Sequence, residues 1–163
     1  ANTTAQLDQI GMAHQATNST LQDFMAAASN DQWDIIQATW SLQSIPPDER
    51  PAIFRWLREH GQRVLIAEFD VPLFQDDYAP DRVQYVVDRY QHGLQEYPGD
   101  DQVAQGFLLP VFFGYFDRSA ARTNWEDPIQ AWVDDLRAAG FETVETQPIM
   151  AYFWADSFLI DAR

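Results

Sequence analysis

The sequence predicts an α/β fold, because two apolar strand patterns flank a helical one. Residues 33–42, WDIIQATWSL, contain Ile35, Ile36 and Trp40 without a helical stripe, which is typical of a buried strand. Residues 63–69, RVLIAEF, hold four consecutive apolar residues, as in a strand that is covered on both faces. Because a helix lies between them, we expect the two strands to pair in parallel through a right-handed crossover.

The helices carry their own boundary signals. In the helix between the two strands, Pro47 suits the first turn, and Asp48 and Glu49 suit the positive end of the helix dipole. Gly61 stands where a C-cap glycine is expected. Residues 79–97 predict a second helix, with a proline near its start and an apolar side.

The end of the chain returns to the same pattern. Asp127 is expected to cap a helix that has Pro128 in its first turn and that ends at Gly140. Residues 141–149 and 151–162 then predict two strands, which we expect to be antiparallel neighbours.

The remaining segments are less regular. Residues 3–10 predict a short helix, and residues 11–25 a weak strand over 12–17 followed by a helical patch. Residues 100–116 are unusually aromatic, and Pro110 with two glycines argues against a long straight helix there.

Composition excludes several classes of function. The net charge is −15, with 25 acidic and 10 basic residues, and all the basic residues are Arg. Such a surface repels nucleic acid and anionic membranes. No apolar run is long enough for a membrane span, no export leader is visible, and cysteine is absent, so we expect a cytoplasmic protein. The three scattered histidines do not suggest a metal site.

Several segments in this order resemble the C-terminal half of class I S-adenosylmethionine-dependent methyltransferases. Residues 33–61 are similar to the family's fourth strand and following helix, and residues 62–71 to its fifth strand. The segment WVDDLRAAGFETVETQPI resembles the last helix and the start of the final hairpin, and AYFWADSFLIDA its closing strand. The resemblance implies a Rossmann-like sheet with a single domain over 1–163, in which 72–124 form a helical, aromatic-rich insertion or lid.

The family's first two strands, with their glycine-rich loop and ribose-binding acid, have no counterpart here. In the family's sheet order, 3-2-1-4-5-7-6, these strands lie in the middle, so their absence would expose strand edges. Three explanations stay open: the chain is a piece of a longer protein with a missing N-terminal segment, a partner such as a second copy supplies the strands, or the fold closes without them.

The resemblance also implies a cofactor, S-adenosylmethionine, and residues that contact it. Thr20 and Leu21 match the end of the family's third strand, beside the adenine. Ala38, Thr39 and Trp40 match the end of the fourth strand, beside the methionine part and the methyl group. For Trp40, a place in the core is the alternative.

Three residues are candidates for the chemistry. Glu68 and Asp70 follow the strand at 63–69, on the edge where such sheets bind ligands. His92 stands four residues after Asp88 on a predicted helix, so the carboxylate could orient its ring as a general base. The alternatives are a loop or arginine contact for Glu68 and an ordinary surface pair for Asp88 and His92.

Aromatic residues suggest an apolar acceptor site. The candidates are Tyr85, Phe112, Phe113, Tyr152 and Trp154. The expected function is methyl transfer from S-adenosylmethionine to the oxygen or carbon of an apolar or aromatic small molecule. The alternatives are a non-catalytic half-domain that pairs with another segment, and a binding protein for apolar ligands. Plain core or a dimer interface is the other explanation for the aromatic insertion.

Overall fold

The computed structural model describes residues 3–28, 30–76, 78–117, 119 and 121–163. The chain divides into two compact units, Ala1–Asp31 and Gln32–Arg163, and each is considered by itself. The prediction of a single domain stays a prediction. No helix in the described ranges is both long and apolar enough to cross a membrane.

The first unit is helical. It contains α1 (Thr3–Gln9) and α2 (Leu21–Ala27), which confirms the short helix and the helical patch. The strand predicted over 12–17 is wrong, because these residues have no regular structure. The described residues of this unit include no strand that could pair with the segment, and strand formation depends on such neighbours.

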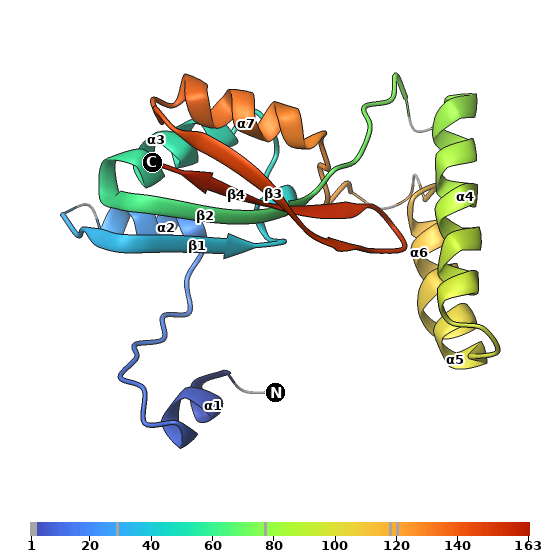
Figure 1. The fold of residues 1–163 in the computed structure, drawn as a ribbon, viewed down its shortest axis with the longest axis horizontal. Coiled ribbons are helices and arrows are strands. Elements are labelled where there is room, and N and C mark those ends of the chain that lie inside the picture. Colours follow the sequence, from blue (N-terminus) through green and yellow to red (C-terminus); the bar gives the residue numbers. More distant parts are fainter. Residues whose placement is uncertain (1–2, 29, 77, 118, 120) are drawn as a thin grey trace. The chain divides into compact units, whose positions relative to one another are not determined.

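The second unit is built on one four-stranded sheet in the order β1-β2-β4-β3 (Figure 1). The strands β1 (Trp33–Thr39) and β2 (Gly61–Phe69) are parallel, as predicted. The hairpin of β3 (Val144–Ala151) and β4 (Asp156–Ala162) is antiparallel, and β4 also pairs antiparallel with β2. The α/β class is confirmed.

Two helices cover one face of this sheet (Figure 1). They are α3 (Arg50–His60) and α7 (Ile129–Ala138), which contact each other and the strands β2, β3 and β4. Their apolar sides and the facing strand residues form the core: Ile53, Phe54, Leu57, Val64, Ile66, Trp132, Val133, Leu136, Ile160 and Ala162.

The boundaries of α3 differ from the prediction. The helix begins at Arg50 with Pro51 in its first turn, because a 3₁₀ turn, η1 (Leu42–Ser44), and a further turn use up the residues around Pro47. Gly61 follows the helix but is extended, with φ −112°. Its glycine identity has another cause: a Cβ atom there would lie 2.9 Å from Ile36 Cδ1 and 3.1 Å from the Leu57 carbonyl oxygen.

The ends of α7 are partly as predicted. Gly140 has φ +101°, so it terminates the helix in the left-handed conformation that favours glycine. Asp127 does not cap the helix: its carboxylate pairs with Arg50, and the N-terminal Ile129 amide donates to Asp70 Oδ1 at 2.9 Å instead.

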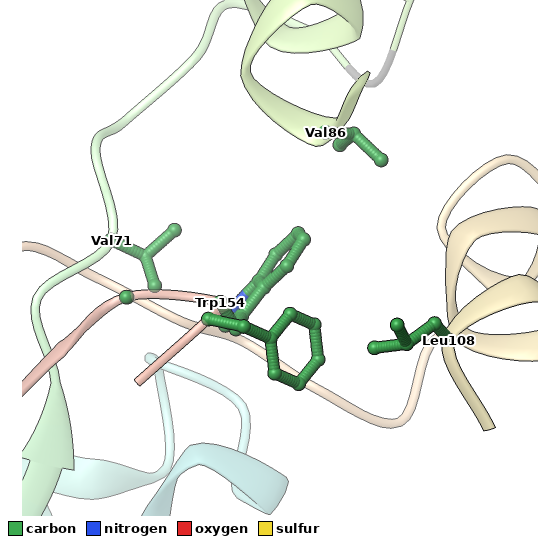
Figure 2. Close-up of a cluster of buried hydrophobic side chains, with 6 residues drawn as sticks. Val71, Val86, Leu108 and Trp154 are labelled. Atoms are coloured by element: carbon green, nitrogen blue, oxygen red, sulfur yellow. The ribbon is translucent and has the colours of Figure 1, made fainter. Parts of the chain in front are cut away.

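The insertion is helical, as predicted. It contains α4 (Pro80–Glu96), α5 (Asp101–Val103), a π-helical stretch η2 (Ala104–Leu108) and α6 (Leu109–Gly114). The wide π turns come just before Pro110, whose ring and missing N–H do not fit a regular α-helical interior. The apolar side of the insertion packs on the turn between β3 and β4. Figure 2 shows this cluster of Val71, Val86, Leu108, Phe153, Trp154 and Ala155.

The expectation that residues 33–42 form a buried strand is wrong in two respects. The strand ends at Thr39, and its side chains are exposed or half-buried, with Ile35 53% exposed. The reason lies in its place in the sheet, since β1 is at the edge and, in the part of the chain that the structure describes, has β2 as its one neighbouring strand.

Candidate active site

The carboxyl ends of β1 and β2 meet at Trp40. Its amide donates to the Ala67 carbonyl at 2.9 Å, but its φ of 47° turns the chain out of the strand. The indole stacks on Phe69 with ring centroids 5.8 Å apart, and its Nε1 donates to Ser157 Oγ at 3.1 Å. A bulky residue at positive φ is strained, and such strain clusters at functional sites. Trp40 is also 40% exposed, so it is not a core residue.

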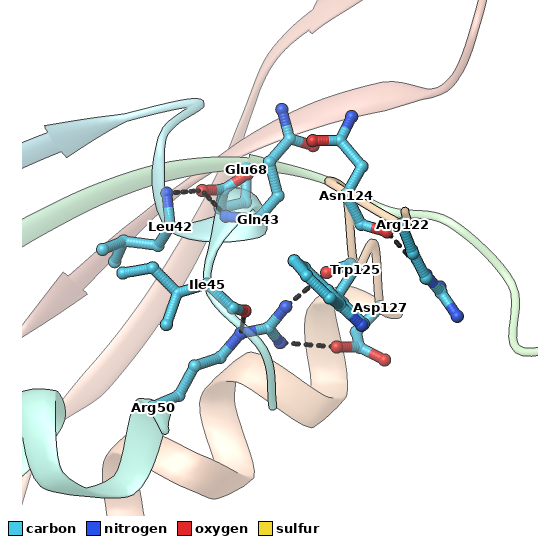
Figure 3. A network of polar contacts seen from close by, with 9 residues as sticks. All are labelled: Leu42, Gln43, Ile45, Arg50, Glu68, Arg122, Asn124, Trp125 and Asp127. Carbon is cyan, nitrogen blue, oxygen red and sulfur yellow. Dashed lines mark hydrogen bonds and ion pairs between the residues drawn. The ribbon is translucent and has the colours of Figure 1, made fainter. Parts of the chain in front are cut away.

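Glu68 is buried beneath this edge. Its Oε1 accepts from the backbone amides of Leu42, at 3.0 Å, and Gln43, at 3.3 Å (Figure 3). Burial raises the pKa of Glu68 to about 7, although these two hydrogen bonds and the charge of Arg50 act in the opposite direction. Glu68 therefore holds the loop after β1 and does not face solvent, in agreement with the loop contact considered above.

A second buried charge joins the two helices. The Arg50 guanidinium donates to the carbonyl oxygens of Ile45, at 3.0 Å, and Trp125, and to Asp127 Oδ2 (Figure 3). It also lies 4.1 Å from the centre of the Trp132 ring. The start of α3 is thereby tied to the start of α7 and to the segment before it.

An aromatic cluster surrounds a third acidic residue, Glu126. Trp154 Nε1 donates to Glu126 Oε1 at 2.8 Å, and the Tyr115 hydroxyl donates to the same carboxylate at 3.1 and 3.2 Å. The Tyr115 and Trp154 rings are stacked with centroids 4.1 Å apart. Burial and the charge of Glu126 both raise the pKa of Tyr115, so its hydroxyl stays protonated and can donate.

A cavity of about 870 Å³ opens beside this cluster. Residues from the loop after β2, from α4, from α6 and from the segment before α7 line it. They are Asp76, Tyr78, Arg82, Val111, Gly114, Tyr115, Phe116, Asp117, Ala121, Arg122, Thr123, Asn124 and Glu126.

The predicted cofactor residues lie in both units. Thr20 caps α2, since its Oγ1 accepts from the Asp23 amide at 3.1 Å, and Leu21 begins that helix. In the second unit, Ala38 is half-buried and Thr39 Oγ1 accepts from Gln37 Nε2 at 3.0 Å. These two residues adjoin Trp40 at the end of β1.

The predicted catalytic residues are not gathered at one point. Asp70 serves the N-terminus of α7, and Glu68 serves the loop after β1. His92 is exposed on α4, and the described hydrogen bonds place Asp88 with Gln84, at 2.8 Å, and not with His92. Their catalytic roles stay predictions.

The predicted acceptor residues lie in three places. Tyr85 and Trp154 join the cluster around Glu126, since the Tyr85 hydroxyl donates to the Trp154 carbonyl at 2.8 Å. Phe112 packs on Tyr90 within the insertion, and Phe113 is 61% exposed. Tyr152 stacks on Phe69, with centroids 5.6 Å apart, and Phe69 also stacks with Trp40.

The turn of the last hairpin is longer than predicted. Tyr152, Phe153 and Trp154 belong to this turn and not to the strand predicted over 151–162, which begins only at Asp156. Phe153 and Trp154 are both buried against the insertion helices.

Sequence reasoning also missed Glu126. Its signal was available, because it lies where the insertion returns to the last helix of an α/β unit.

Comparison with known proteins bears on the fold. No family model matches the chain, and no curated protein matches it. Among solved structures, the S-adenosylmethionine-dependent methyltransferase SibL, in its apo form, has a TM-score of 0.52 at 14% identity, over 98% of this chain and 38% of that one. At this identity the similarity shows a shared fold. The sheet order β1-β2-β4-β3, with β4 antiparallel to β2, is the order 4-5-7-6 that the sequence resemblance implies.

Two further solved structures are similar. PigF with SAH has a TM-score of 0.44 at 17% identity, over 79% of this chain and 30% of that one. A protein of Nostoc punctiforme, provisionally described as an O-methyltransferase, has a TM-score of 0.45 at 11% identity, over 81% of this chain and 31% of that one. This chain therefore spans 30–38% of the length of these three proteins.

Proposed function

We propose that this chain forms part of a methyltransferase that transfers the methyl group of S-adenosylmethionine to a small aromatic molecule. The methyltransferase-type sheet, which it shares with SibL, carries the proposal. In such a sheet, ligands bind outside the carboxyl ends of the strands. The exposed, strained Trp40 lies at this edge, as a residue that contacts a ligand should.

The chemistry makes few demands on the protein. When bound, the sulfonium of S-adenosylmethionine supplies an electrophilic methyl group. The protein then has to align the acceptor with that methyl group and exclude water. In this proposal Ala38, Thr39 and Trp40 contact the methionine end of the cofactor.

Binding of S-adenosylhomocysteine, measured by calorimetric titration, tests the proposal. We expect saturable binding, and we expect Trp40→Ala to weaken it at least tenfold, since stacking and packing on this edge are lost. The control is Tyr97→Ala, which removes another exposed aromatic side chain at the end of α4. If neither this chain nor a longer natural form of the protein that contains it binds S-adenosylhomocysteine, the proposal is wrong.

The unpaired edge of β1 supports a second proposal, that the sheet is completed by a further strand. Among the described residues only β2 pairs with β1, and Ile35 is 53% exposed beside the free edge. A free edge presents unsatisfied amide and carbonyl groups that another strand can pair with. A strand from a longer form of the protein or from a second copy would serve, and this is the partner-dependent half-domain considered above.

A further inference from the structure

The cavity beside Glu126 lies at the same edge of the sheet as the end of β2. The Val71 amide, just after β2, donates to the Asp127 carbonyl at 3.4 Å, so the residue after Glu126 is fixed to that strand. Trp154, which donates to Glu126, comes from the turn that precedes β4. The Glu126 carboxylate is thus bound by the turn between β3 and β4, its neighbour Asp127 is fixed next to the end of β2, and Glu126 lines a space of about 870 Å³.

Hydrogen bonds orient the Glu126 carboxylate but do not use all of its acceptor positions. It accepts hydrogen bonds from Trp154 Nε1 and from one Tyr115 hydroxyl, which is shared between its two oxygens. A carboxylate has about four acceptor positions, so this one has room for a donor from the cavity. Burial raises the pKa of Glu126, while its two hydrogen bonds and the charges of Arg82 and Arg122 lower it. The net rise makes the carboxylate a stronger base than an exposed one.

The cavity also offers flat apolar surface and charges of both signs. Asp76 and Asp117 line it as well as Arg82 and Arg122, and the two arginines are the cations whose charge acts on Glu126. The Arg82 guanidinium carbon lies 5.4 Å from the centre of the Tyr115 ring. Tyr115 and Phe116 provide aromatic surface, which suits a planar molecule. Cations in such a site stabilise negative charge that develops on an oxygen atom.

We propose that Glu126 is the proton acceptor for a planar acceptor molecule that binds in this cavity through an ionisable hydroxyl group, a phenol or an enol. The inference rests on the proposed function. The acceptor's O–H proton passes to a Glu126 oxygen, and the acceptor oxygen attacks the sulfonium methyl group of the donor. A new C–O bond forms, the C–S bond breaks, and its electron pair stays on sulfur as a neutral thioether.

A carboxylate base favours phenols and enols as acceptors because their hydroxyl groups are acidic. A phenol has a pKa near that of tyrosine, about 10, whereas water and saturated alcohols have a far higher pKa and are much weaker acids. A carboxylate can assist loss of the phenolic proton, especially beside Arg82 and Arg122, but is far too weak a base for a saturated alcohol. Glu126 therefore acts both in the reaction and in the choice of substrate.

Binding of two simple probes tests the cavity without any methyl donor. The probes are 4-methylphenol, which can donate a hydrogen bond to Glu126, and 4-methylanisole, which cannot. We expect the full chain to bind the phenol about tenfold more tightly, as a hydrogen bond to a charged group implies, with tryptophan fluorescence as the signal. Glu126→Gln should reduce this preference to near unity. Glu145→Gln, an exposed position on β3, should leave it unchanged.

Failure of this inference is distinct from failure of the proposed function. If the wild-type chain binds both probes equally or binds neither, the inference is wrong, whatever happens with S-adenosylhomocysteine. In the active protein, Glu126→Gln should lower kcat at least a hundredfold at neutral pH and remove the rise of rate that follows ionisation of Glu126, while binding of S-adenosylhomocysteine stays unchanged. Loss of donor binding in this variant, with its fold intact, would overturn the inference too.

Discussion

Two buried charged residues at the carboxyl edge of the sheet are satisfied to different degrees. Arg50 donates to three acceptors and lies over Trp132. Glu68 accepts two hydrogen bonds through Oε1, but its buried Oε2 has no hydrogen-bond partner among the described residues. A buried carboxylate with a half-satisfied acceptor set favours its neutral form. The stability of the second unit should therefore depend on the protonation of Glu68.

Glu68→Gln should remove this dependence. The pKa of Glu68 rises from 4.5 to about 7 on folding, so the folded state holds a proton that the unfolded state releases between these values. The contribution of Glu68 to the free energy of unfolding is therefore fully present below pH 4.5. It is lost as the pH rises towards 7, a change of about 3 kcal/mol. Urea unfolding across this range should show the wild type losing stability relative to Glu68→Gln.

Glu145→Gln serves as the control, because it removes a carboxylate from an exposed position on β3. Its free energy of unfolding should follow that of the wild type at every pH. A Glu68→Gln profile that runs parallel to the wild type would show that Glu68 ionises alike in the folded and unfolded states.

Single residues also show where sequence reasoning stops. Gly140 was predictable as a helix terminator because its cause is local, a left-handed φ after the last turn. The cap of α7 was not predictable. Asp127 has the right residue type and position, but Arg50, 77 residues earlier, takes its carboxylate, and Asp70 supplies the acceptor instead. Such exchanges between distant residues leave no local pattern.

At the scale of elements, the insertion depends on close contact between α4, η2 and the turn of the last hairpin (Figure 2). Gly93 makes this approach possible. A Cβ atom at Gly93 would lie 2.9 Å from Leu108 Cδ2 and 3.1 Å from Phe153 Cδ2. Contacts this short force side chains in a packed core to move.

Gly93→Ala should therefore destabilise the chain. Crowding in a packed core lowers stability by about 1–3 kcal/mol, and the gain in helix propensity from glycine to alanine offsets up to about 1 kcal/mol. Gly106→Ala is the matched control, because a Cβ atom at Gly106 would meet nothing within 4 Å. Urea unfolding should show a loss for the first variant and none for the second. Equal stability of the two variants would show that the contact at Gly93 relaxes without strain.

The strands and helices were predictable to the extent that their patterns are local. The β1–α3–β2 unit and the last hairpin have the predicted order and direction. The start of α3 was misplaced because Pro47 and Pro51 both suit a first turn, and the 3₁₀ turn between Leu42 and Ser44 decides between them. The turn at 152–155 was predicted as strand because its aromatic residues are apolar like those of a buried strand. Their burial comes instead from the insertion, which packs on the turn.

At the scale of the whole molecule, the candidate site was predictable in place but not in content. The edge of the sheet follows from the order of the elements. Glu126, Arg82 and Tyr115 converge on one cavity from the loop before α7, from α4 and from the end of α6. Their convergence on the cavity depends on how the insertion packs, so it cannot be predicted from the spacing of these residues in the sequence.

The sheet of the second unit ends in two edges that differ in their protection. The outer strand β3 contains Pro148, and its register with β4 shifts between Pro148 and Met150. A proline and a bulge both hinder pairing with another strand. The β1 residues 33–39 contain no proline, and their register with β2 shows no shift. Association through strand pairing should therefore use β1.

Ile35→Lys and Ile149→Lys test this difference as a matched pair, because the two side chains are 53% and 47% exposed. A lysine on an edge strand opposes pairing by charge and by its hydration. Sedimentation velocity over a range of concentrations should show that the wild-type chain self-associates. Ile35→Lys should lower the associated fraction severalfold, whereas Ile149→Lys should leave it close to wild type, and circular dichroism should show both folded. A monomeric wild type, or an equal effect of the two variants, would mean that the free edge of β1 does not recruit another strand.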